Sequence, residues 1–171
     1  ISPIVPARPT ARVLEQAYRP TVTPLGDRHT VTAGLRPTGA PEWGRWTRQI
    51  ELDEATGDVV MTGADDKPLL VLDRVGLGRV ALLASDQAWL WNRGYDGGGP
   101  QLELLRRLAH WMMKEPELEE EALWAEATGD TLRIIRRSLE HAVPPVTVTT
   151  PTGETRVYDL TETSPGTFTY E

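Results

Sequence analysis

The chain has 171 residues, of which 39% are hydrophobic and 25% charged, a composition that supports a buried core and argues against intrinsic disorder. It contains no cysteine, which excludes disulfides, thiolate nucleophiles and cysteine-bound zinc within this sequence, and no apolar run reaches the roughly 20 residues that span a bilayer. The net charge of −7 argues against nucleic acid and anionic membranes as partners, because both attract positive charge.

The acidic charge is concentrated at one end of the chain. Residues 1–115 carry 14 basic and 14 acidic side chains, whereas residues 116–171 carry 4 and 11. Five of the six tryptophans also precede Pro116. This asymmetry predicts two domains, residues 1–116 and residues 117–171. Because the sequence begins with Ile-Ser-Pro rather than Met, we expect a segment of a longer protein.

The elements of the first part are short until residue 68. Three prolines in residues 1–10 predict an extended lead-in that is neither helix nor central strand. The next patterns predict, in order, a short strand within residues 11–23, a helical turn within 27–35, and strands over 46–52 and 57–62.

Two apolar runs, Pro68–Val75 and Arg79–Ser85, are separated by a Gly-x-Gly turn and therefore predict a β-hairpin. The second run is apolar without alternation from Val80 to Ala84, a pattern typical of a strand that is buried on both faces. Burial on both faces predicts helices on each side of the sheet, and hence an α/β fold.

The clearest helix is predicted from Gln101 to Lys114. Its apolar residues recur at helical spacing, Pro100 suits the helix start, and Pro116 stops propagation. Beyond Pro116 short β-prone runs recur between turn residues, which predicts a small all-β, immunoglobulin-like sandwich that is either cut short or minimal. These runs are residues 123–127, 132–136, 146–149, 155–160 and 167–170.

Polar and aromatic side chains are concentrated in the loop of residues 85–96, which follows the predicted buried strand. In open α/β sheets ligands bind at the carboxyl ends of strands, so this loop is the candidate binding site. The candidate residues are Ser85, Asp86, Gln87, Trp89, Trp91, Asn92, Arg93 and Tyr95. The simpler interpretation is favoured, namely that the tryptophans anchor the loop and that Asp86 caps a turn, because large aromatic side chains mostly serve packing.

No motif in the sequence predicts catalysis or a bound cofactor. Gly97–Gly99 is not followed by the lysine of a phosphate-binding loop, and Ser85-Asp86 has no nearby histidine to complete a nucleophilic triad. His29, His110 and His141 lack metal-binding spacing, and we expect them at surface or capping positions. We therefore predict no catalytic residue, no metal and no cofactor.

The run from Pro68 to Trp91, followed by the helix of residues 102–113, resembles the closing strands and last helix of glutamine amidotransferase-like domains of large bacterial membrane proteins of unknown function. The shared features are Gly-x-Gly-Arg-Val, a strand that ends in Ser-Asp, a tryptophan-rich loop and a helix. Trp43-Gly-Arg-Trp46 and Val60-Met-Thr-Gly63 also fit. The resemblance covers about residues 8–123, and it implies that they form the C-terminal half of a flavodoxin-like fold followed by a β-sandwich module.

Active class I amidotransferases carry a histidine near the end of the strand where this chain has Ser85-Asp86-Gln87. The resemblance thus implies a non-catalytic recognition or assembly segment of a membrane-anchored envelope protein that faces the periplasm. Its partner is an unidentified protein or small molecule, and the segment itself does not span the membrane. One alternative is a hydrolase or amidotransferase whose nucleophile lies outside this segment. Another is a carbohydrate- or protein-binding β module.

Overall fold

The structure is a computed structural model that describes residues 4–36 and 42–170. The chain divides into two compact units, residues 1–118 and residues 119–171, which we call the first and second units. The sequence analysis placed this boundary after residue 116.

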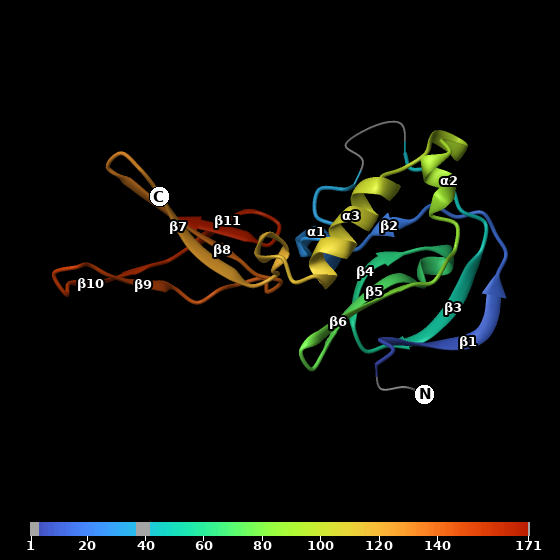
Figure 1. Ribbon diagram of the computed structural model, residues 1–171, viewed down its shortest axis with the longest axis horizontal. Coiled ribbons are helices and arrows are strands. Elements are labelled where there is room, and N and C mark those ends of the chain that lie inside the picture. The colour runs from blue at the N-terminus through green and yellow to red at the C-terminus, as the bar shows by residue number, and fades with distance from the viewer. Residues whose placement is uncertain (1–3, 37–41, 171) are drawn as a thin grey trace. The chain divides into compact units, whose positions relative to one another are not determined.

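The first unit contains a four-stranded antiparallel sheet (Figure 1). Its strand order is β2 (Thr21–Val22), β4 (Asp58–Thr62), β5 (Pro68–Val75) and β6 (Gly78–Leu83). The predicted hairpin is confirmed, because β5 and β6 pair from Leu70 opposite Leu83 to Val75 opposite Gly78. Gly76 closes its turn with a positive φ of 58°, which glycine adopts without steric cost.

A second antiparallel pair, β1 (Ala7–Leu14) and β3 (Gln49–Ala55), packs on one face of this sheet. Leu52 and Ala7 form a buried cluster there with Val71 of β5. The expected lead-in is therefore partly a strand. Pro9 lies opposite Leu52 between two register shifts, and such irregularities accommodate a residue that has no N–H to donate.

The opposite face of the four-stranded sheet is covered by α3 (Gln101–Met112), whose buried residues Leu104, Leu108 and Trp111 join the main core. The helix was predicted to continue to Lys114, but Lys114 takes a left-handed φ of 61°, which ends it. The other helical elements are α1 (Pro24–Arg28), α2 (Trp89–Asn92) and the 3₁₀ turns η1 (Ala64–Asp66), η2 (Tyr95–Gly97) and η3 (Pro116–Leu118).

The predicted α/β, flavodoxin-like fold is wrong. The protein is mostly β, with 42% of residues in strands and 19% in helices, and the paired strands among the described residues are antiparallel. The error has a physical origin. Both faces of β6 are contacted, but Ala81 and Leu83 pack toward the core beneath α3, whereas Leu82 packs toward the β1–β3 layer. A second layer of strands thus takes the place of the second layer of helices that the apolar run predicted.

The second unit is built from antiparallel strands, and this arrangement fits the β-sandwich that was expected for it. Its larger sheet has the order β11 (Thr161–Ser164), β12 (Thr167–Tyr170), β8 (Thr131–Arg137) and β7 (Ala122–Thr128). The smaller sheet pairs β9 (Val146–Thr149) with β10 (Thr155–Tyr158). Tyr158 and Tyr170, one from each sheet, pack together with ring centroids 4.6 Å apart and ring planes tilted by 47°. The sequence did not predict β11.

Within the described residues, no helix has both the length and the apolar character needed to cross a membrane.

Candidate functional site

Residues 85–96, which we call the tryptophan loop, follow β6 and include α2. The loop is anchored by Trp91, which is 2% exposed. Its ring centroid lies 4.7 Å from that of Trp46 and 5.1 Å from that of Trp43, and its indole Nε1 donates a hydrogen bond of 2.8 Å to the carbonyl of Gly44. The Trp43–Trp46 segment therefore forms the frame against which the loop packs.

Two glycines allow this close packing. A side chain at Gly44 would overlap the carbonyl oxygen of Tyr95, and a side chain at Gly99 would overlap the ring of Trp91. The amide of Gly44 also donates a 2.6 Å hydrogen bond to the carbonyl of Gly98. The frame and the end of the loop are thus joined backbone to backbone, which fixes the position of the loop.

Asp96 joins the loop to two arginines. Its carboxylate accepts from Nε of Arg45 at 2.8 Å and from the Arg45 amide at 3.1 Å, and it lies 3.4 Å from Nη1 of Arg19. The hydrogen bonds from Arg45 lower the pKa of Asp96 below its usual value. The carboxylate therefore stays charged at neutral pH and holds the loop against the frame.

The start of the loop is fixed by Gln87 and Ser85. The side-chain oxygen of Gln87 accepts from the amides of Thr47 at 2.6 Å and Arg48 at 3.2 Å. The Ser85 hydroxyl donates to the carbonyl of Arg48 at 2.7 Å, and the same carbonyl accepts from the phenol of Tyr18 at 3.1 Å. Burial raises the pKa of Tyr18 to about 12, so its phenol stays protonated at neutral pH.

The outer side of the loop carries exposed side chains. Trp89 is 53% exposed and Tyr95 is 49% exposed, and Arg93 is exposed as well. The amide of Arg93 bonds to the carbonyl of Trp89 across the single turn of α2, so these two residues lie one helical turn apart on the same side. The exposed set includes an indole, a phenol and a guanidinium, the groups that dominate binding energy in protein interfaces.

The eight candidate residues thus fall into two groups. Ser85, Gln87 and Trp91 hold the loop in place through the contacts described above. Asp86, Trp89, Asn92, Arg93 and Tyr95 are exposed. The structure therefore combines a fixed inner side with an accessible outer side.

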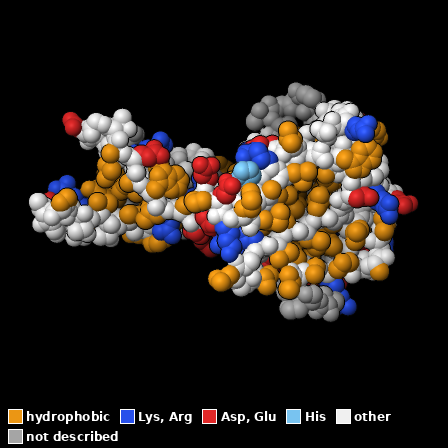
Figure 2. Space-filling model, in the orientation of Figure 1, with side chains coloured by type: hydrophobic (Ala, Val, Ile, Leu, Met, Phe, Trp, Pro, Cys, Tyr) orange, Lys and Arg blue, Asp and Glu red, His pale blue; other side chains and the backbone are white. Residues whose placement is uncertain are grey.

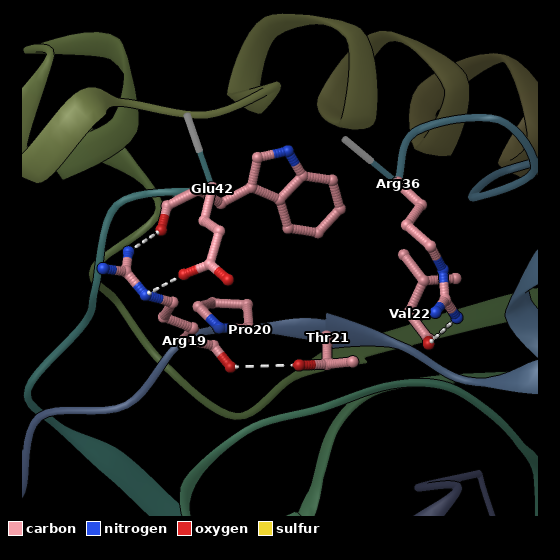
Figure 3. Close-up of a pocket in the computed structure, with 7 residues that line it drawn as sticks. Arg19, Pro20, Thr21, Val22, Arg36 and Glu42 are labelled. Atoms are coloured by element: carbon pink, nitrogen blue, oxygen red, sulfur yellow. Dashed lines mark hydrogen bonds and ion pairs between the residues drawn. The ribbon is translucent and has the colours of Figure 1, made fainter. Parts of the chain in front are cut away.

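A small pocket lies next to the frame (Figure 3). Its volume is about 150 Å³, and it is lined by Arg19, Pro20, Thr21, Val22, Arg36, Glu42 and Trp43. Arg19 is paired with Glu42 at 2.9 Å and Arg36 with Asp27 at 2.8 Å. Because each arginine already has a carboxylate partner, the pocket is not built for a strongly anionic ligand.

A second, open groove of about 390 Å³ lies beside Gln87. Glu15, Gln16 and Ala17 form one part of its lining, and Thr47, Arg48 and Gln87 form the rest. Gln16 is held there by a 2.8 Å hydrogen bond to Asp65. The groove is shallow and polar, so it exposes hydrogen-bonding groups without enclosing a ligand.

Sequence reasoning placed Asp96 at the end of the polar loop but did not connect it with Arg19 and Arg45. Asp96 is 77 residues from Arg19 and 51 from Arg45, so no local pattern links them. The Trp43-Gly-Arg-Trp46 segment contributes to the sequence prediction only through the resemblance. In that segment two tryptophans flank Gly44, and this pattern is the one local signal that the segment packs against another part of the chain.

The described residues contain no group of three or more His, Asp or Glu side chains that is placed to hold a metal ion. His29 was expected at a surface or capping position. It is the C-cap residue of α1, but its side chain is fully buried, with its ring 5.7 Å from that of Trp111 and Nδ1 accepting from the Val31 amide at 3.2 Å. His110 is half-buried, with Nδ1 2.6 Å from a carboxylate oxygen of Glu115.

Comparisons of the chain with protein-family models, with curated proteins and with solved structures found no match.

Proposed function

We propose that this chain is a non-catalytic recognition segment that binds a protein partner through the outer side of the tryptophan loop, within a membrane-anchored bacterial envelope protein. The observation that carries the proposal is the pairing of an exposed Trp89 with a buried Trp91 in the same four-residue helix. An indole that is half in solvent, on a loop held by hydrogen bonds and contacts between aromatic rings, is a typical interface anchor.

The rigidity of the loop favours binding. Trp91 and Asp96 tie the loop to the frame, and Gln87 ties it to the adjoining Thr47, so little conformational freedom remains to be lost when a partner binds. Arg93, one helical turn from Trp89, adds a cation that contacts carboxylates or aromatic faces on the partner. A protein surface is the expected partner because the exposed groups lie on a loop and not inside a deep cavity.

The membrane-protein context rests on the resemblance of residues 68–91 and 102–113 to amidotransferase-like domains, and not on a flavodoxin-like fold. Ser85 belongs to the segment that stands where active class I amidotransferases carry a histidine. Its hydroxyl donates a hydrogen bond to a backbone carbonyl, and the residue is nearly buried. This arrangement supports a structural role for Ser85 and favours recognition over hydrolysis.

Photo-crosslinking in the source organism tests the proposal. Benzoylphenylalanine at position 89 or 95 should give a discrete adduct with one protein. The same residue at position 157, on β10 of the second unit where Val157 is 63% exposed, should give none and serves as the matched control. Arg93→Glu combined with the probe at position 89 should reduce the yield.

Two results would contradict the proposal. One is equal crosslinking from positions 157 and 89, which would mean that the loop has no specific partner. The other is a rise in melting temperature with glutamine that Asp86→Ala abolishes, because ligand binding stabilises the folded state and such a site would support the enzyme alternative.

A further inference from the structure

A second surface of the first unit, separate from the tryptophan loop, consists of the free edge of β6. This strand is the last in its sheet, and its residues Val80, Ala81, Leu82 and Leu83 are all half-buried. Natural proteins protect exposed edges with charges, prolines or bulges. Residues 80–83 contain none of these, and their pairing with β5 is regular.

The hydrogen-bond pattern shows which backbone groups face this edge. The Ala84 amide donates to Leu69 at 2.8 Å, and in an antiparallel ladder the bonded residues alternate along the strand. Leu82 and Val80 therefore bond toward β5, whereas the N–H and C=O groups of Ala81 and Leu83 point away from it. Within the described residues, no hydrogen bond joins these outward groups to another element.

A row of exposed apolar side chains on α3 lies beside this edge. Leu102, Leu105, Ala109 and Met112 recur at spacings of three and four residues, and all are exposed, Leu102 by 79%. They share one side of the helix, which we call the α3 stripe.

The α3 stripe lies on the β6 side of the helix. On the other side of α3, Arg107 donates to the carbonyl of Ala33 at 2.7 Å, in the segment that follows α1. The helix α1 packs against β2 and β4, which lie at the opposite end of the sheet from β6. Figure 2 shows hydrophobic side chains gathered over the part of the first unit where Figure 1 shows α3 and β6.

We propose that a second copy of this chain covers this surface, with the two β6 strands paired antiparallel about Ala81. This register joins the two sheets into one and brings the two α3 stripes together across the axis. It is self-complementary, because Val80 lies opposite the partner's Leu82 and Arg79 lies opposite the partner's Leu83. No like charges face each other, and residues 1–115 carry equal numbers of acidic and basic side chains.

The absence of cysteine from the sequence makes a direct test possible. In this register the Cα atoms of Ala81 and the partner's Ala81 lie about 5.5 Å apart, within the range that a disulfide bridges. Ala81→Cys should therefore form a disulfide-linked dimer under mild oxidation. Leu77→Cys is the matched control: residue 77 is more exposed, but in the dimer it lies roughly 27 Å from its counterpart, at 3.4 Å per strand residue.

Sedimentation of the unmodified chain over a range of concentrations completes the test. We expect a reversible dimer that persists at high salt, and Leu105→Glu should weaken it by roughly tenfold or more, because a charge would be buried in an apolar interface. A chain that stays monomeric at every concentration would overturn the proposal. A dimer in which Leu77→Cys crosslinks as efficiently as Ala81→Cys would also overturn it.

Discussion

The two units differ in how much apolar surface they bury. Among the described residues, the first unit holds 20 buried hydrophobic side chains, including four tryptophans, whereas the second holds only Ile134, Ile135 and Phe168. The first unit can therefore fix a functional loop through side-chain packing. The second relies on the backbone hydrogen bonds of its sheets and on a few contacts, as small domains often do. Recognition through a fixed loop is thus expected of the first unit.

The largest effect is predicted for Phe168→Ala. Loss of a buried Phe costs about 3–5 kcal/mol, and a unit of this size has roughly 3–8 kcal/mol of stability in total. Hydrogen exchange should show lost protection in β8 and β12 while β5 keeps its own. Leu123→Ala, on the same face of the same sheet but exposed, should cost less than about 1 kcal/mol. Loss of protection in β5 as well would contradict the division into two units.

Trp46→Ala should cost the first unit a similar free energy without unfolding it. The fully buried ring packs against Trp91 and Tyr18. Its removal leaves a large cavity, which should lower the free energy of unfolding by about 3–5 kcal/mol. The first unit is larger, and its total free energy of unfolding is expected to be roughly 6–18 kcal/mol. Denaturant unfolding measures the change, and Trp89→Ala is the control, since an exposed indole should contribute less than about 1 kcal/mol. Equal losses from both variants would mean that the two tryptophans are not placed as described.

Gly44→Ala tests the contact between the frame and the tryptophan loop. The added methyl group would overlap the carbonyl of Tyr95, and relieving that overlap should cost about 1–3 kcal/mol. Gly78→Ala is the control, because its nearest neighbour would be 3.4 Å away, an ordinary contact. If thermal unfolding finds the two variants equally stable, the loop does not pack on the frame as closely as the structure shows.

The smallest effect is a pH dependence from Tyr18. Its folded-state pKa of about 12 lies above the usual 10.0, so the folded state favours the protonated phenol. This contribution to stability is fully present below pH 10 and is lost as the pH rises toward 12. Ultraviolet titration should find one of the four tyrosines ionising late, and Tyr18→Phe should remove that step. A titration with no late step would place Tyr18 in solvent.

The sequence predicted the elements whose signals are local. The β5–β6 hairpin follows from two apolar runs around Gly76 and Gly78, and α3 follows from its helical spacing. The pairing of β1 with β3 joins residues about 40 positions apart and includes Pro9, so no local pattern indicated it. The same limit led to the wrong fold class, because an apolar run shows that a face is covered but not whether helices or strands cover it.

The candidate site was predictable as a segment but not residue by residue. Trp89 and Trp91 are two positions apart, so on a helix they point to nearly opposite sides, yet their sequence contexts are alike. Only the distant segment from Trp43 to Trp46 determines which indole is buried. The role of Asp96 likewise depends on Arg45, 51 residues away.

The central claim is that the tryptophan loop is a preformed surface, and hydrogen exchange at single-residue resolution tests it most directly. The amides of Gly44, Thr47 and Gly98 each donate a hydrogen bond that holds the loop or its frame. We predict that all three exchange slowly, at rates near those of β5. If they exchange as fast as the Leu77 turn, the loop is not fixed before binding, and the account of recognition by a rigid surface is contradicted.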